Sequence, residues 1–189
     1  MRIIRKNSRP YQILKYLALG SGILTISLLS PLAGSKLIQA GIKSYFRKKR
    51  FEKEKFINDL KNLQKRDLVD IKESKNREIE VKIRKNGKDA VSSYKIEEMK
   101  LKIPAKWDKK WRLIMFDIPH DFKKARDAFR ERLRNLNFYH IQKSVFITPY
   151  PCEEEIDFIT SFYNIRDFVL IFYIDRFEDE EKIRHYFKI

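Results

Sequence analysis

Cysteine, histidine and glycine are all scarce in this chain of 189 residues. The lone Cys152 excludes an internal disulfide, and one cysteine with three histidines does not supply a structural zinc cluster. The five glycines form no glycine-rich phosphate loop, and the sequence contains neither a paired acid and base motif nor an internal repeat. These absences favour a binding protein over an enzyme, in a reducing, cytoplasmic setting.

Positive charge, by contrast, is abundant and unevenly distributed. Residues 1–100 contain 25 Lys and Arg against 11 Asp and Glu, whereas residues 101–189 contain 17 against 15, within a net charge of +16. A concentrated excess of cations attracts an anionic polymer, because each neutralised phosphate releases condensed counterions. The N-terminal half therefore predicts a nucleic-acid partner, and an anionic membrane surface is the alternative.

The uncharged run Tyr16–Ser35 has about the length of a membrane span. Glycine, serine and threonine interrupt it, Pro31 is typical of a helix end, and basic residues flank both of its sides. We therefore expect two buried helices, residues 11–29 and 33–46, and a membrane anchor is the less favoured alternative.

The rest of the N-terminal half predicts a third helix and a β-hairpin. Residues 51–65 place apolar side chains at helical spacing, and residues 68–71 and 79–83 read as two strands around a polar turn. Three helices followed by a hairpin are typical of a winged helix-turn-helix, whose third helix enters the major groove of DNA. The expected domains are 1–103, which binds DNA, and 104–189.

The residues expected to contact double-stranded DNA lie in a basic cluster, on the polar face of the third helix and in the hairpin turn. They are Arg47, Lys48, Lys49, Arg50, Lys53, Lys55, Asn58, Lys61, Asn62, Lys65, Lys75 and Arg77. Asparagines suit base edges and lysines suit phosphates. Since a solvated helix face is the commoner fate of any single lysine, the prediction depends on the group.

The C-terminal half predicts a β-α-β-β-α-β order, which is the ferredoxin-like arrangement and makes the chain α+β. The expected strands are residues 111–117, 138–142, 144–150 and 168–174, with helices from Asp121, as a cap, and from Pro151. The first of these helices carries a second basic face, which is expected to be a secondary nucleic-acid contact and is made of Lys123, Lys124, Arg126, Arg130 and Arg134.

Two resemblances follow from motifs in this half. The segment Leu113-Ile114-Met115-Phe116-Asp117-Ile118-Pro119, followed by a basic helix and by Gln142-Lys143-Ser144-Val145-Phe146, resembles the CRISPR spacer-acquisition endonuclease family. Residues 106–112 and 144–151 look like the central region of the PaaX-type repressors of phenylacetate catabolism, which also carry a winged helix first. Those repressors usually continue into a further helical domain, and the nucleases usually lack the winged helix.

Each resemblance implies its own function. The repressor family implies a homodimeric DNA-binding regulator of transcription that needs no cofactor, with its two sheets joined through apolar residues such as Phe172 and Tyr173. The nuclease family implies a Mg²⁺-dependent endonuclease or a structural subunit of a spacer-integration complex, with Asp117 as a Mg²⁺ ligand paired across the dimer axis and CRISPR adaptation proteins as partners. The alternative for Asp117 is a turn cap, and His120 and Ser144 are weaker candidates for a base and a nucleophile.

Overall fold

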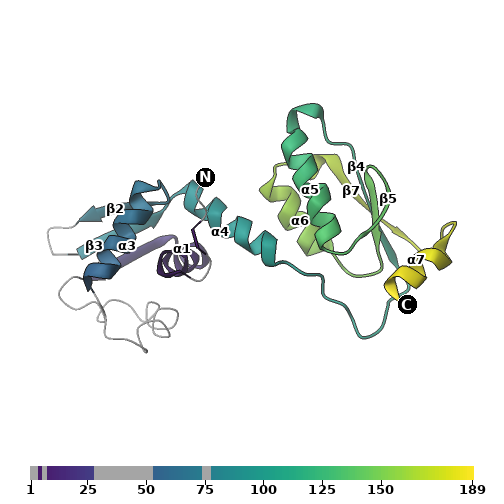
Figure 1. Cartoon of the computed structure of the whole chain (residues 1–189), viewed down its shortest axis with the longest axis horizontal. Helices are drawn as coiled ribbons and strands as arrows, with labels where there is room; N and C mark the ends of the chain where they lie inside the picture. The colour runs from purple at the N-terminus through teal and green to yellow at the C-terminus, as the bar shows by residue number, and fades with distance from the viewer. Residues whose placement is uncertain (1–3, 6–7, 28–52, 74–77) are drawn as a thin grey trace. The chain divides into compact units, whose positions relative to one another are not determined.

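The computed structural model describes residues 4–5, 8–27, 53–73 and 78–189, and the fold is α+β, as predicted (Figure 1). The chain divides into two compact units, Met1–Lys95 and Ile96–Ile189. Each unit buries apolar side chains of its own. In the ranges given above, no helix is both long enough and apolar enough to cross a membrane.

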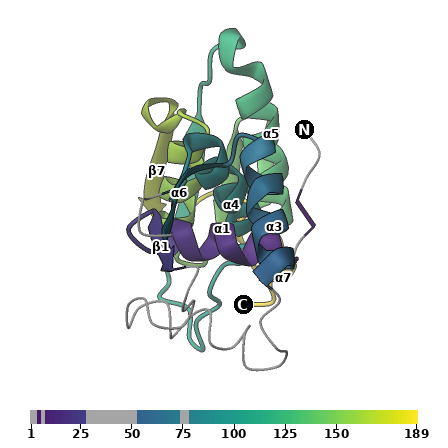
Figure 2. The same ribbon diagram turned by 90° about the vertical axis from the view of Figure 1, so that its left-hand side faces the viewer.

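The first unit begins with helix α1, Arg9–Leu19. Ser8 caps it by accepting a hydrogen bond from the Tyr11 amide at 3.4 Å, and Leu14 and Leu17 are buried on one face. Helix α3, Lys53–Lys65, packs beside α1 (Figure 2) and buries Leu60 and Leu63. The third helix predicted from the sequence is therefore confirmed as an element.

The prediction of a single helix from residue 11 to residue 29 is wrong. Helix α1 stops at Leu19, and Ile23–Ser27 forms strand β1 instead. Gly22 adopts a φ of 80°, a left-handed conformation that glycine tolerates and that ends helical geometry before the β-branched residues that follow. The helix predicted over 33–46 lies outside the described residues.

Three antiparallel strands form the sheet of the first unit, in the order β1-β3-β2. Strand β2 spans Val69–Glu73 and strand β3 spans Glu78–Ile83, so the predicted hairpin is present. Ile79, Val81 and Ile83 are buried while the residues between them are exposed, which is the period of a strand with one buried face. The following helix α4 spans Lys85–Glu98.

The second unit has a four-stranded antiparallel sheet in the order β5-β6-β4-β7. Its strands are β4 Trp111–Phe116, β5 Tyr139–Gln142, β6 Val145–Thr148 and β7 Val169–Ile174. Helices α5, Lys123–Asn135, and α6, Glu153–Phe162, lie side by side (Figure 1) and share one core with Ile114, Phe116 and Phe146 of the sheet.

Two details differ from the sequence predictions. The backbone passes through a short 3-10 helix, His120–Phe122, before α5, and Asp121 lies inside that turn rather than capping α5. A further helix, α7, spans Glu180–Phe187 and was not predicted. Ile183 and Phe187 of α7 join Trp111 and Ile147 in a separate small core, so α7 covers part of the sheet face opposite α5 and α6.

Candidate nucleic-acid interface

The exposed face of α3 gathers polar and basic side chains in the first unit. At ~100° per residue, Lys55, Asn58, Lys61, Asn62 and Lys65 share one side of the helix, and all five are exposed. Leu60 and Leu63, on the other side, are 1% exposed. The structure thus brings these five predicted residues onto one surface, while the side chain of Lys53, which begins α3, lies outside the described part.

A contact at the middle of α3 and contacts just beyond its C-terminal end hold the helix in place. Arg9 of α1 forms an ion pair with Asp59 of α3 at 3.1 Å. Burial raises the pKa of Asp59, and the positive charge of Arg9 opposes that rise. Beyond the C-terminal end, Asp67 has a left-handed backbone, with φ of 60°, and its carboxylate accepts from Asn86 at 2.8 Å and pairs with Arg84. The helix is therefore fixed to α1 and to the start of α4.

The other predicted DNA contacts of the first unit, namely Arg47, Lys48, Lys49, Arg50, Lys75 and Arg77, lie outside the described residues. In the second unit, the basic face of α5 is less uniform than predicted. Lys123, Lys124 and Arg134 are exposed, whereas Arg126 and Arg130 are half-buried. Arg126 donates a hydrogen bond to the carbonyl of Ile118 at 3.5 Å, so this guanidinium already has a partner within the unit.

Asp117 follows β4 and is exposed. Its backbone amide donates to the carbonyl of Phe168 at 3.1 Å. The 3-10 helix His120–Phe122 has no side-chain cap, so no hydrogen bond supports the alternative that Asp117 caps this turn. Over the described ranges, no three His, Cys, Asp or Glu side chains come together as metal ligands. The Mg²⁺ hypothesis therefore depends on a second copy of the chain.

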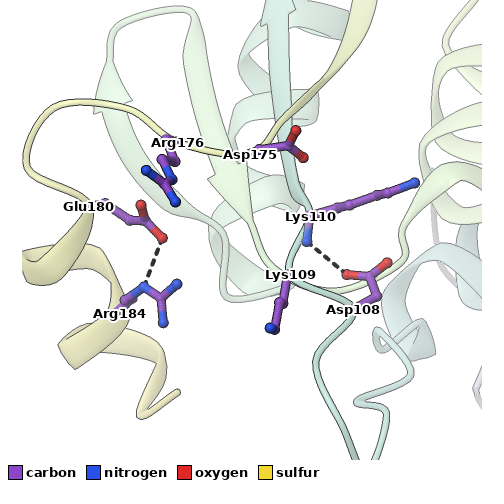
Figure 3. Close-up of a pocket in the computed structure, with 7 residues that line it drawn as sticks. All are labelled: Asp108, Lys109, Lys110, Asp175, Arg176, Glu180 and Arg184. Carbon is purple, nitrogen blue, oxygen red and sulfur yellow. Dashed lines mark hydrogen bonds and ion pairs between the residues drawn. The ribbon is translucent and has the colours of Figure 1, made fainter.

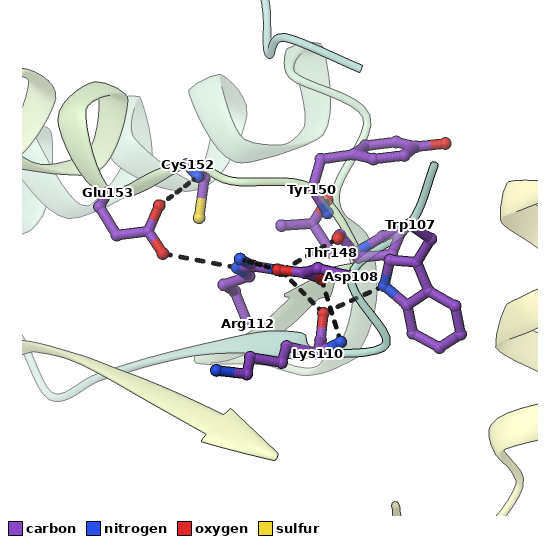
Figure 4. Close-up of polar contacts among 9 residues, drawn as sticks. Trp107, Asp108, Lys110, Arg112, Thr148, Tyr150, Cys152 and Glu153 are labelled. Carbon is purple, nitrogen blue, oxygen red and sulfur yellow. Dashed lines mark hydrogen bonds and ion pairs between the residues drawn. The ribbon is translucent and has the colours of Figure 1, made fainter. Parts of the chain in front are cut away.

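The best-connected polar group of the second unit centres on Arg112 (Figure 4), and it was not predicted. Arg112 is 6% exposed and donates to both carboxylate oxygens of Asp108, at 2.8 and 2.6 Å. It also donates to the carbonyls of Lys110 and Pro149 and lies 3.4 Å from Glu153. The sequence feature that could have predicted this ion pair is the spacing of four residues between Asp108 and Arg112, inside the motif that carries the PaaX resemblance.

On the sheet face opposite α5 and α6, the part that α7 does not cover is exposed. Leu113 and Met115 of β4 are opposite Phe172 and Leu170 of β7 and on the same face, since residues two apart in a strand point the same way. Leu170 is 57% exposed, Phe172 41% and Met115 40%. We call this group, with Val145 of β6 opposite Met115, the open sheet face.

The two aromatic residues predicted to join the subunits fall on different faces. Phe172 belongs to the open sheet face, whereas Tyr173, the next residue in β7, points to the side of α6 and hydrogen-bonds Glu153. Burial raises the pKa of the Tyr173 hydroxyl, and so does its hydrogen bond to Glu153. A single flat interface cannot use both side chains.

Comparisons with known proteins cover the second unit. Residues 104–185 match the family model described as the PaaX protein central Cas2-like domain. This match confirms the predicted resemblance to the PaaX-type repressors for the segment that contains Arg112, the open sheet face and Asp117. A search of the curated proteins gives no match.

Proposed function

Because residues 104–185 match the family model of the PaaX central Cas2-like domain, we propose that this chain is a homodimeric regulator of transcription that binds double-stranded DNA. In this proposal the first unit reads DNA and the second joins two copies. The observation that carries it is the face of α3, where five basic or amide side chains are exposed on one side of a helix whose other side is buried.

The topology of the first unit supports a winged helix. Helix α3 leads directly into the hairpin β2-β3, and β1 completes a small sheet next to β3. In a winged helix the helix before the hairpin lies in the major groove. Asn58 and Asn62 would then reach base edges, while Lys55, Lys61 and Lys65 would contact phosphates.

The second unit supports dimer formation through its open sheet face. Its strand order, β5-β6-β4-β7 with α5 and α6 on one face, agrees with a ferredoxin-like arrangement. Side chains such as Leu170 and Phe172 leave a contiguous apolar surface in water, and covering it with the same surface of a second copy is favourable. Two copies of α3 would then be related by a two-fold axis.

The experiment that tests the proposal is a salt titration of duplex binding. We expect Lys61→Glu with Lys65→Glu to weaken binding and to lower the slope of log K against log salt by about one for each lost phosphate contact. Lys88→Glu, which reverses an exposed lysine on α4, is the matched control and should change neither quantity as much.

Asn58→Ala and Asn62→Ala separate specific from non-specific binding. On a duplex selected from a random pool by the wild-type chain, each should lose about 1–3 kcal/mol of discrimination while the salt slope stays the same. Equal affinities and salt slopes for wild type and the lysine variant would contradict the assignment of α3 as the DNA-binding helix.

A further inference from the structure

A charged cavity of about 530 Å³ lies in the second unit (Figure 3). Its walls are the segment just before β4, the segment just after β7, and α7. The volume falls within the range of roughly 300–1,000 Å³ that is usual for small-molecule sites. Every residue that lines it is charged, so a fitting ligand is polar and carries charge itself.

Two of the three acidic residues in the cavity are already paired within the chain. Asp108 is held by Arg112 at 2.6 Å. Glu180 accepts from Arg184 at 2.7 Å and from the indole of Trp111 at 3.2 Å. These hydrogen bonds keep the pKa of Glu180 below its ordinary value, so this carboxylate stays ionised and paired.

The remaining charges are mainly positive. Lys109, Lys110 and Arg176 outnumber Asp175, and none of these four side chains forms an ion pair with another described residue, although the charge of Arg176 also helps to lower the pKa of Glu180. The side chain of Lys110 extends away from α7, whereas Arg176 lies beside Glu180 and Lys109 lies on another wall of the cavity (Figure 3). Cations therefore reach the cavity from three separate segments of the chain.

Hydrogen bonds to Asp108 hold the wall that carries Lys109. Lys109 has a left-handed φ of 64°, which residues other than glycine rarely adopt. The neighbouring Lys110 amide donates to Asp108 at 3.1 Å, and Arg112 binds the same carboxylate. A strained conformation that its surroundings hold in place is a known feature of ligand sites.

We propose that this cavity binds a small molecule that carries a phosphate group, with Lys109, Arg176 and Arg184 as its cationic partners. A tetrahedral phosphate presents several oxygens in different directions, which suits donors from three walls better than a single planar carboxylate does. The cavity lies in the second unit and the proposed DNA interface in the first, so the two proposals rest on different residues.

The tryptophans make the proposal directly measurable. The chain has two, Trp107 and Trp111, and each contacts a residue that lines the cavity. Arg184 lies over the ring of Trp107 at 4.6 Å, and Trp111 donates to Glu180. An anion that draws Arg184 toward itself changes the surroundings of both indoles, and hence their emission.

The test is a titration of the full chain with inorganic pyrophosphate at constant ionic strength, followed by tryptophan fluorescence. We expect a saturable change in wild type that is at least about ten-fold weaker in Lys109→Gln and in Arg176→Gln. Lys143→Gln, an exposed lysine in the turn between β5 and β6, is the matched control and should titrate like wild type. Both test positions are exposed, so the variants should fold, and a far-ultraviolet circular dichroism spectrum checks this.

Three results would overturn the proposal. One is the lack of a saturable change in wild type, and another is equal affinity in wild type and in both cavity variants. The third is a change in emission produced by short duplex DNA but not by pyrophosphate, because the cavity would then bind the backbone of a polymer rather than a small molecule.

Discussion

Arg112 and Asp108 form a bidentate ion pair in which Nη1 lies 2.8 Å from Oδ1 and Nη2 lies 2.6 Å from Oδ2. The arginine is buried inside β4, whereas the Asp108 side chain is 43% exposed. The same guanidinium donates to the carbonyl of Pro149, just beyond β6. One side chain thus joins the entry of β4 to the end of its neighbouring strand.

Replacing Arg112 should destabilise the second unit. Arg112→Ala removes one hydrogen-bond donor from each of the carbonyls of Lys110 and Pro149 and from the Glu153 carboxylate, and we expect a loss of about 2–4 kcal/mol in the free energy of unfolding. Asp108→Asn should cost about 1 kcal/mol or less, because that side chain is partly solvated. Urea unfolding followed by tryptophan fluorescence measures both, and similar losses for the two variants would contradict the role given to Arg112.

Acid should weaken the same unit. The hydrogen bond from Arg112 holds the pKa of Asp108 below its ordinary value of 3.8, and the hydrogen bond from Arg184 holds the pKa of Glu180 below 4.5. A carboxyl whose pKa is lower in the folded state stabilises that state above the unfolded pKa, and this stability is lost as the pH falls through the folded pKa. We therefore expect the urea midpoint of the tryptophan signal to fall as the pH drops below about 4.5.

The variant Asp108→Asn identifies the source of this pH dependence. It removes one of the two carboxyls, so its urea midpoint should change less steeply with pH than that of the wild type. If the two pH profiles have the same slope, Asp108 does not contribute in the way proposed.

Gly87 should be intolerant of any side chain. A Cβ at this position would lie 2.3 Å from the Leu68 carbonyl oxygen and 2.8 Å from Cγ1 of Ile83. Since the Leu68 carbonyl also accepts from the Arg84 amide, the backbone cannot shift without weakening that bond. We expect Gly87→Ala to destabilise the first unit by about 1–3 kcal/mol, measured by hydrogen exchange of the amides of β2 and β3.

Gly20→Ala is the matched control for this change, because its Cβ would meet the Tyr16 carbonyl at an ordinary 3.4 Å. The control should alter amide protection in the same strands by only a few tenths of a kcal/mol. Comparable losses in both variants would indicate a general effect of removing glycine rather than the close contact at Gly87.

A charge on the open sheet face should prevent dimer formation. Leu170→Asp and Phe172→Asp place a carboxylate on an apolar surface that is solvated in the single chain, so the monomer should stay folded while self-association weakens by at least about ten-fold. Sedimentation equilibrium measures this. Ile103→Asp, at a residue 71% exposed and outside the sheet, is the control. A wild-type chain that is monomeric at tens of micromolar would contradict the dimer.

The spacing of the hydrophobic residues predicted the secondary structure correctly where it was maintained over a whole helix or strand. The alternation through Ile79, Val81 and Ile83 predicted β3, and the spacing of Leu60 and Leu63 predicted α3 with its exposed polar face. The failure at Ile23–Ser27 has a physical cause, because a short apolar run without charges fits a buried helix and a buried strand equally well. Residues 23–27 form a strand because they pair with β3. The sequence around Gly22 does not indicate that β3, which lies far along the chain, is the pairing partner.

The sequence by itself determined the α+β class, the family resemblance of the second unit and the concentration of positive charge in the first half. These properties are local or compositional, so they can be seen without a fold. Only the tertiary structure decided which of Phe172 and Tyr173 lies on the side of α6, and that Arg112 is buried and joins several polar groups. It alone brought Lys109, Arg176 and Arg184 around one cavity, because segments far apart in sequence meet only when the sheet and α7 pack together.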